Sequence, residues 1–345
     1  MDQEGKIMRA TAVILAAALV LRLGMAGFFQ PVIRLLTSRP VVAMMLYLET
    51  GRVLRPAQPV EPAPTETTAP TEPTEETTAP TMPEETVETT APTEPALPAF
   101  APGDASLVQV HSYCGYDADV PTMLAQPLTW DLHSDGPTVL ILHSHATESY
   151  ENTENYRETS FYRTTDENYN MVSVGDALVQ FLEVRGIRAL HDRQLHDHPS
   201  YSDAYNNSRT AAQAYLDQYP SIQLVLDLHR DAVADRDGEQ LKYTVETPLG
   251  TAAQLMLVVG TDASGLSHAT WPENMSLAVK FHARLEQLCP GICRPISFRS
   301  QRFNQDLSTG ALLVEVGAAG NTRQEAIAAT EYLAEAIADL AKGTQ

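Results

Sequence analysis

A segment rich in proline, threonine and glutamate, residues 57–102, divides this chain of 345 residues into parts with different physical properties. The segment contains nine glutamates and neither lysine nor arginine. Such a composition cannot bury enough apolar surface to offset the entropy lost on folding, and its like charges favour an extended chain. We therefore predict a disordered stalk over 57–102, which confines folded structure to the segments on either side.

The segment before the stalk has the composition of a membrane anchor. Residues 10–29 form an apolar stretch of 20 residues that is broken only by Arg22. As a helix this stretch would be about 30 Å long, close to the thickness of the hydrocarbon core of a bilayer. Arg22 costs about 3 kcal/mol at the membrane centre, and the surrounding aliphatic and aromatic side chains offset that cost. We predict a membrane anchor within 1–30 and a juxtamembrane segment over 31–56; a cleaved signal peptide and a core helix are the alternatives.

The overall composition excludes several classes of protein. With 23 Lys and Arg against 44 Asp and Glu, the formal net charge is −21, which argues against nucleic acid as a partner because phosphate binding requires clustered basic residues. Three cysteines are too few for a disulfide scaffold or a cysteine-based zinc finger. Cys289 and Cys293 could still pair in an exported domain, which would leave Cys114 free.

The remaining segment, 103–345, alternates between two hydrophobic patterns. Apolar runs typical of buried strands occur at 137–143, 221–229, 254–260 and 311–317, and a further short strand is predicted at 186–190. Helical patterns occur at 170–185, 203–218 and 272–288, and a last helix follows the capping box Thr322–Glu325. This alternation predicts one α/β domain with a mostly parallel sheet and helices on both faces. Ligands of such domains bind beyond the carboxyl ends of the strands.

Residues suited to metal binding and proton transfer lie at or near three of these predicted strand ends. They are His143 at the end of the first run with His145 and Glu148 just after it, Asp227 and His229 in the run 221–229, and Glu315 in the run 311–317. Because the carboxyl ends of parallel strands meet at one edge of a sheet, a single site can collect all three groups. Asp227 and His229 share a face by the strand period of two, so that Asp227 could orient the imidazole.

These residue types indicate a zinc hydrolase. One imidazole of the His143 and His145 pair, together with Glu148 and His229, would leave a fourth coordination position open for water. The His-x-x-Glu spacing favours His145, although the residues alone leave both histidines possible. A carboxylate inside an apolar run must be paired, bound to metal or shifted in pKa, and we assign Glu315 the role of proton acceptor for the attacking water.

A second histidine group, His191, His196 and His198, lies in a polar stretch between two predicted elements. We interpret this group as part of a solvated loop rather than as a metal site.

Several of these motifs occur together in a known order. His143-Ser-His-Ala-Thr-Glu-Ser-Tyr150, Asp227-Leu-His-Arg-Asp231, Val259-Gly-Thr-Asp262, Asn304-Gln-Asp-Leu-Ser308 and Leu313-Val-Glu-Val-Gly317 resemble the stage II sporulation protein P family over roughly residues 105–340. That family is related to the zinc-dependent N-acetylmuramoyl-L-alanine amidases. The resemblance implies an amidase-like catalytic domain of the phosphorylase/hydrolase-like type over 103–345, behind a membrane anchor and a disordered stalk.

The resemblance also implies roles for individual residues. It makes His229 a zinc ligand, one of His143 and His145 another ligand, Glu148 a third, Glu315 the catalytic carboxylate, and Arg230, Asn304 and Gln305 substrate contacts. Within that scheme, Arg230 would stabilise the developing oxyanion.

The function implied by the resemblance is hydrolysis of the amide bond between N-acetylmuramic acid and L-alanine in peptidoglycan during endospore engulfment, with an added action on peptide cross-links. The implied cofactor is Zn²⁺, and the implied partners are the stage II sporulation proteins D and M. The expected location is the cell membrane, with one span and the catalytic domain in the septal intermembrane space. A zinc carboxypeptidase-like peptidase acting on stem peptides and a non-catalytic wall-binding scaffold are the alternatives.

Overall fold

The computed structural model describes residues 100–151, 156 and 161–342. The predictions for the anchor, the juxtamembrane segment and residues 57–99 of the stalk lie outside these residues. Among the described residues, no helix is both long enough and apolar enough to cross a bilayer. Phe100 packs against the hydrophobic core, and the short 3-10 helix η1 (Pro102–Leu107) follows it. The last three residues of the predicted stalk therefore belong to the folded part of the chain.

The centre of the fold is a seven-stranded sheet with the order β1-β8-β7-β9-β4-β2-β3. Its strands are β1 (Val110–Ser112), β2 (Val139–Leu142), β3 (Ala189–His191), β4 (Leu224–Asp231), β7 (Leu255–Val259), β8 (Ile296–Phe298) and β9 (Ala311–Ala318). Every neighbouring pair is parallel except β7 and β9. The predicted mostly parallel sheet is confirmed, and β2, β4 and β9 run in one direction so that their carboxyl ends share an edge.

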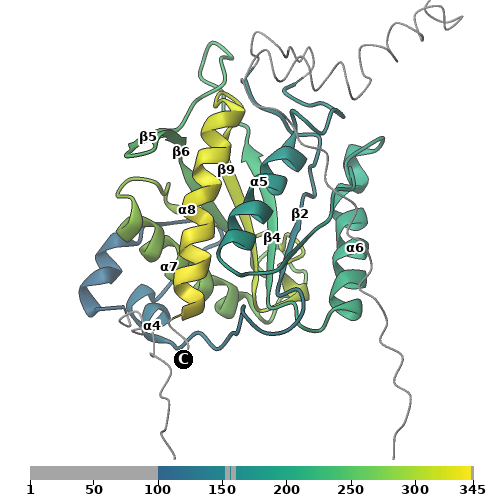
Figure 1. Ribbon diagram of the computed structural model, residues 1–345. Coiled ribbons are helices and arrows are strands. Elements are labelled where there is room, and N and C mark those ends of the chain that lie inside the picture. Colours follow the sequence, from purple (N-terminus) through teal and green to yellow (C-terminus); the bar gives the residue numbers. More distant parts are fainter. Residues whose placement is uncertain (1–99, 152–155, 157–160, 343–345) are drawn as a thin grey trace, which may run out of the picture. The chain divides into compact units, whose positions relative to one another are not determined.

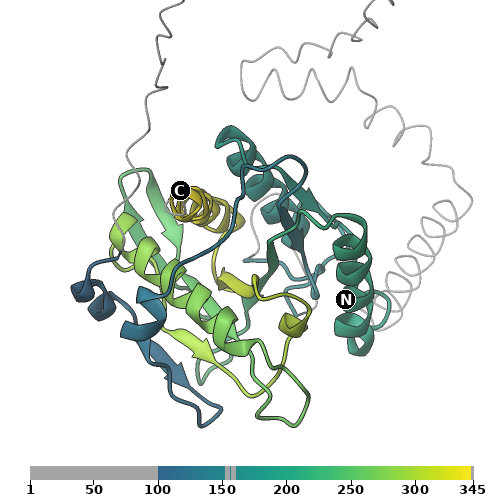
Figure 2. The ribbon, with the colours of Figure 1, turned by 90° about the horizontal axis from the view of Figure 1, so that it is seen from below.

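Helices cover both faces of the sheet, as predicted. The helices α5 (Met171–Val184), α7 (Trp271–Leu288) and α8 (Arg323–Lys342) contribute to the larger hydrophobic core on one face. The helix α6 (Ala204–Gln218) covers a smaller cluster on the other face. Figure 1 shows α6 apart from α5 and α8, with β2 and β4 between them, and Figure 2 shows α8 nearly end-on. The α/β class is therefore confirmed.

Local interactions explain where these helices begin. The Asn170 side chain accepts a hydrogen bond from the Val172 amide at 3.0 Å, which caps the first turn of α5. At the start of α8 the predicted capping box is present: the Thr322 amide donates to Glu325 Oε2 at 3.0 Å, and the Glu325 amide donates to Thr322 Oγ1 at 3.2 Å. These caps satisfy amides that have no partner inside the helix.

Some elements lack the patterns used for prediction. The strands β1 and β8 have three residues each, and α4 (Val120–Ala125) has six. A separate hairpin, β5 (Thr244–Thr247) and β6 (Gly250–Ala253), has a largely exposed first strand. Elements of this length are too short to show a hydrophobic period.

Alternation along the strands sets which side chains meet. In β4, Leu224, Leu226 and Leu228 lie in the core beneath α5 and α8, whereas Val225 lies in the cluster beneath α6. The period of two therefore directs Asp227 and His229 toward the α6 face. Glu315, which is the register partner of His229 on β9, shares that face.

Candidate metal and catalytic site

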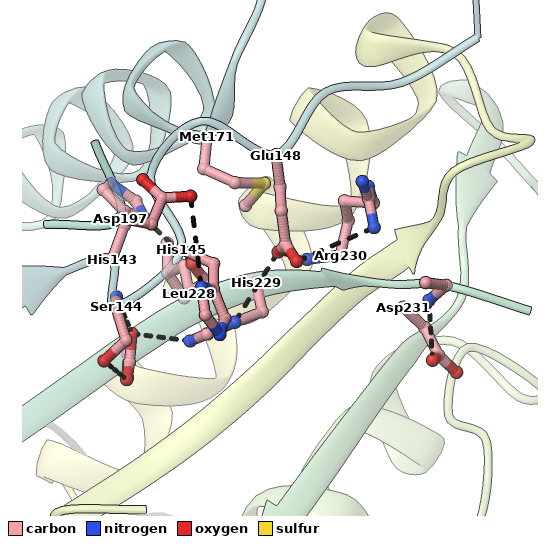
Figure 3. A network of polar contacts seen from close by, with 12 residues as sticks. His143, Ser144, His145, Glu148, Met171, Asp197, Leu228, His229, Arg230 and Asp231 are labelled. Carbon is pink, nitrogen blue, oxygen red and sulfur yellow. Dashed lines mark hydrogen bonds and ion pairs between the residues drawn. The ribbon is translucent and has the colours of Figure 1, made fainter. Parts of the chain in front are cut away.

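Three side chains from the ends of two strands converge at the carboxyl edge of the sheet. The imidazoles of His145 and His229 meet edge to face, with ring centroids 5.3 Å apart. His229 Nδ1 lies 3.6 Å from Glu148 Oε2. Figure 3 shows Glu148 beside His229 and Arg230, with His145 on the other side of His229. The structure thus brings together His145, Glu148 and His229 from the predicted ligand set.

His229 has its orientation fixed by a neighbour on its own strand. Its Nε2 donates a hydrogen bond to Asp227 Oδ1 at 2.8 Å. The same carboxylate accepts from the Ser144 amide at 2.7 Å and from the Ser144 hydroxyl at 2.6 Å. Because a carboxylate only accepts, the proton of His229 sits on Nε2 in the neutral ring, and Nδ1 is the nitrogen directed toward Glu148.

His145 carries a buried nitrogen without a hydrogen-bond partner. Its side chain is 11% exposed, and Nδ1 lies 3.9 Å from Asp197 Oδ2, which is beyond hydrogen-bonding distance. The ring stacks on Tyr201 at 4.5 Å and contacts Tyr205 edge to face at 5.4 Å. An imidazole held by aromatic rings with one free buried nitrogen is suited to ligate a cation.

Glu315 supplies the second carboxylate of the site. It pairs with His229 in the β4–β9 ladder, and its Oε2 has no hydrogen-bond partner. Burial raises the pKa of Glu315 to about 8, because the positive charge of His229 offsets only part of the loss of hydration and the Glu148 charge adds to it. A carboxyl group whose pKa lies near neutrality can both accept and deliver a proton.

At Glu148 and His229, unlike at Glu315, the neighbouring charges outweigh burial and favour the charged form. Burial by itself would raise the pKa of Glu148, but Arg230 and His229 outweigh that effect and lower this pKa to about 2. Burial opposes the charged form of His229, yet the Asp227 and Glu148 carboxylates raise its pKa well above the usual value. In the metal-free protein, Glu148 is therefore ionised while Glu315 holds its proton at neutral pH.

His143 lies outside this cluster. It continues the alternation of β2 toward the α5 side, where its Nδ1 donates to the Leu228 carbonyl at 2.9 Å and its Nε2 lies 2.8 Å from His191 Nε2. Burial and the neighbouring His191 lower the pKa of His143 to about 3. Of the two histidines that the sequence left open, only His145 contacts the ring of His229.

Arg230 is directed into the protein rather than toward a substrate. It is 3% exposed, its Nε donates to the Ser149 carbonyl at 2.8 Å, and a terminal nitrogen donates to the Tyr162 carbonyl at 2.7 Å. Its backbone amide also donates to Glu148 Oε2 at 3.3 Å. These contacts give Arg230 a role in holding Glu148 and the surrounding loop, and they leave the oxyanion role without geometric support.

The side chains of the two predicted substrate contacts, Asn304 and Gln305, form hydrogen bonds within the protein. Gln305 is 2% exposed; its Oε1 accepts from the Gly260 amide and its Nε2 donates to the Val258 carbonyl, both at 2.8 Å. Asn304 has a left-handed backbone with φ of 59° and donates to the Tyr205 carbonyl at 2.8 Å. Gln305 therefore ties its loop to the end of β7, and Asn304 ties the same loop to α6.

The interpretation of the second histidine group as a solvated loop is wrong for two of its members. His196 is 5% exposed and bonds through Nε2 to Asp192 at 2.8 Å, and the side chain of His191 packs against His143. Only His198 is exposed. Although the residues of this segment are polar, they form a buried network, because each charged side chain has a partner.

Cys114, Cys289 and Cys293 are free in the structure.

Two residues that the sequence did not single out join the site. The carboxylate of Asp197 is fully buried, and Arg163 lies between Asp197 and Glu148, with its terminal nitrogens 3.0 and 3.2 Å from the two carboxylates. Their positions in the sequence, in the segment 192–198 and after a tyrosine-rich stretch, follow no spacing rule. Only the fold brings them to the His145–Glu148 turn.

The donor set agrees with zinc in its chemistry. Two imidazoles and one carboxylate, with an unpartnered buried nitrogen on His145, are the ligand types of a catalytic zinc centre. Within the described residues, no three His, Cys, Asp or Glu side chains already stand in a coordinating arrangement. Zinc binding would therefore require side-chain adjustment around His145, Glu148 and His229.

Comparison with known families identifies the chain. Residues 52–338 match the stage II sporulation protein P family. The chain belongs to that family. A curated relative, stage II sporulation protein P of Bacillus subtilis (strain 168), is 27% identical over 218 residues. That alignment covers 60% of this chain and 51% of the relative, so the chain spans about half the length of the curated family member it matches.

Solved structures of amidases show a distant likeness to this family member. An N-acetylmuramoyl-L-alanine amidase of Nostoc punctiforme is 14% identical, with a TM-score of 0.35 over 60% of this chain and 97% of that chain. An N-acetylmuramoyl-L-alanine amidase of Clostridium difficile 630 is 13% identical, with a TM-score of 0.34 over 60% and 95% of the two chains.

Proposed function

We propose that this stage II sporulation protein P family member is a zinc-dependent peptidoglycan hydrolase that cleaves the amide bond between N-acetylmuramic acid and L-alanine. The observation that carries the proposal is the position of Glu315. Its carboxyl group has a free oxygen and a pKa raised to about 8, and it lies beside His229 and interacts electrostatically with His229 and Glu148. A proton-transfer group beside a zinc-type donor set is the arrangement that amide hydrolysis by water requires.

Each residue of the site has a separate task in this proposal. His145, Glu148 and His229 would hold the zinc ion, which when bound polarises the scissile carbonyl and lowers the pKa of water. Asp227 keeps the Nε2 proton on His229 and so directs Nδ1 toward Glu148. The charge of a bound zinc ion would favour the ionised form of Glu315, which would accept a proton from the attacking water at its free Oε2 and return it to the leaving amine of L-alanine.

The proposal extends to the segments outside the described residues. An anchor within 1–30 would hold the chain in the cell membrane by one span, and the stalk would let the catalytic domain reach peptidoglycan in the septal intermembrane space. A stalk of this length reaches roughly 140 Å as a polyproline II chain. Action on peptide cross-links, and assembly with the stage II sporulation proteins D and M, complete the proposal for endospore engulfment.

The test is digestion of purified sporulating-cell peptidoglycan by the full chain, with mass analysis of the products. Two products together support the amidase: glycan strands without stem peptides, and intact stem peptides with L-alanine at the amino end. Released terminal amino acids would instead identify a carboxypeptidase-like enzyme. Binding to the wall without any soluble product would identify a scaffold.

A pair of variants connects the activity to the site. Glu315→Gln should abolish solubilisation while leaving wall binding unchanged, because the amide cannot accept the proton from water. Glu183→Gln makes the same substitution at an exposed position of α5 and serves as the control. Full activity of Glu315→Gln would remove Glu315 from the mechanism.

A further inference from the structure

The turn that carries both His145 and Glu148 is held by two residues from distant parts of the chain. Asp197 accepts hydrogen bonds from the Thr147 hydroxyl at 2.5 Å and from the Thr147 amide at 3.1 Å. Thr147 stands between His145 and Glu148 in the sequence. The buried Asp197 carboxylate therefore fixes the backbone of the His-x-x-Glu turn from the inside.

Arg163 connects this carboxylate to the side chain of Glu148. One terminal nitrogen lies 3.0 Å from Asp197 Oδ2, and the other donates to Glu148 Oε1 at 3.2 Å. The backbone reinforces the connection, because Glu148 and Arg163 form an antiparallel bridge. A planar guanidinium carries donors on separate nitrogens in a fixed fork and can span two carboxylates in this way, whereas all donors of an ammonium group lie on a single nitrogen.

The same guanidinium also reaches His145 by a second route. Its central carbon lies 4.4 Å from the ring centroid of Tyr201, and that ring stacks on His145 at 4.5 Å with an interplanar angle of 14°. On the other side, Asp197 Oδ2 lies 3.9 Å from His145 Nδ1. Asp197 and Arg163 thus contact Thr147 and Glu148 directly, and they lie against His145 through Asp197 Oδ2 and the Tyr201 ring.

We propose that Arg163 and Asp197 are positioning residues that hold His145 and Glu148 in register for zinc binding. This inference rests on the proposed function, since it concerns the same site. Partners that fix the orientation of metal ligands typically contribute 10-fold to 100-fold in metal affinity. The pair therefore sets how tightly the protein holds its metal, separately from the proton transfer at Glu315.

The test measures zinc affinity directly, by competition of the full chain with a chromophoric chelator. Asp197→Asn keeps the shape but loses charge-assisted acceptance from Arg163, and Arg163→Lys keeps the charge but loses the two-carboxylate span. Each should weaken zinc binding about 10-fold to 100-fold. The double variant should bind zinc about as weakly as the weaker single variant, because both substitutions break one connection.

Matched controls come from a similar ion pair away from the site. Arg185 Nε donates to Glu335 Oε2 at 2.8 Å between α5 and α8. Arg185→Lys and Glu335→Gln should leave zinc affinity within twofold of the wild type. Far-UV circular dichroism and thermal unfolding in excess chelator check that Arg163→Lys folds without metal. We expect it to fold, because the Arg163 side chain is partly exposed.

The outcomes separate this inference from the function on which it rests. Wild-type zinc affinity in both Arg163→Lys and Asp197→Asn, or tighter binding in either, overturns the positioning role while the hydrolase stands. If the wild-type chain releases no wall products but both variants bind zinc more weakly than it does, the positioning role is supported and the hydrolase is overturned. Absence of zinc binding by the wild type overturns both.

Discussion

The Nε2 of His229 donates to the Oδ1 of Asp227 over 2.8 Å, between two residues of one strand. The strand period of two puts both side chains on the α6 face, and Asp227 also accepts the amide and hydroxyl of Ser144 beyond β2. One buried carboxylate therefore joins the ends of two parallel strands and selects the tautomer of the imidazole. The local sequence Asp-Leu-His is sufficient to build the pair, whereas the contact with Ser144 requires the β2–β4 pairing.

The first prediction concerns Asp227→Asn. The amide offers one oxygen where three donors converge, so at least one buried donor loses its partner and the free energy of unfolding falls by about 1–3 kcal/mol. Zinc affinity should fall about 10-fold to 100-fold, because His229 is no longer oriented. Urea unfolding in chelator and chelator competition measure the two effects. Asp217→Asn, at an exposed position of α6, should change neither; wild-type values for Asp227→Asn would contradict the joining role.

The second prediction concerns the pH dependence of stability in the metal-free protein. Burial raises the pKa of Glu315 from 4.5 to about 8, so that between these values the folded chain keeps a proton that the unfolded chain has lost. The folded state then binds more protons, and this group lowers the free energy of unfolding as the pH rises from 4.5 to 8. Glu315→Gln removes this contribution.

The measurement is the difference in free energy of unfolding between Glu315→Gln and the wild type, from urea titrations in chelator across pH 4–9. The difference should shift in favour of the variant as the pH rises from about 4.5 to 8, and it should level off above that range. A difference independent of pH would show that Glu315 is ionised in the folded protein at neutral pH.

Much of the central sheet is predictable from the sequence, because its strands are buried on both faces. The runs that contain β2, β4 and β9 are continuously apolar, and the polar residues after or within them stand out against that background. Since these strands are parallel neighbours, the convergence of their ends follows from topology. The short strands β1 and β8 carry no comparable pattern.

The details of the site follow less well from the sequence. Arg230 and Gln305 belong to motifs typical of function, yet their polar atoms bond to backbone groups inside the protein. Conversely, Arg163 and Asp197 lie in unremarkable polar segments and contact the His145–Glu148 turn. Sequence patterns report burial and period, but they do not report which tertiary partner occupies a polar group.

A third prediction concerns Gly175, which lies inside α5. Alanine normally stabilises a helix interior by about 1 kcal/mol relative to glycine. Here a Cβ atom would stand 2.5 Å from His191 Nε2 and 2.7 Å from His143 Nε2. Both rings are held by hydrogen bonds, His143 to Leu228 and His191 to Asp176, so they cannot easily move away.

Gly175→Ala should therefore lower the free energy of unfolding by about 1–3 kcal/mol, as expected for overpacking. Gly103→Ala is the control, since a Cβ atom there meets nothing within 4 Å, and its effect should stay within about 0.5 kcal/mol. Urea unfolding measures both. Stabilisation by Gly175→Ala would mean that the two imidazoles are not packed against α5.

The last prediction separates a structural role from substrate binding at Gln305. Its side chain closes hydrogen bonds to the Gly260 amide and the Val258 carbonyl, so Gln305→Ala leaves two backbone groups unpaired at the end of β7. The free energy of unfolding should fall by about 1–3 kcal/mol. Because the side chain is 2% exposed and directed away from solvent, KM for wall fragments should remain that of the wild type. Gln301→Ala, at a neighbouring exposed position, should alter neither quantity. An unchanged stability with a several-fold rise in KM would restore Gln305 as a substrate contact.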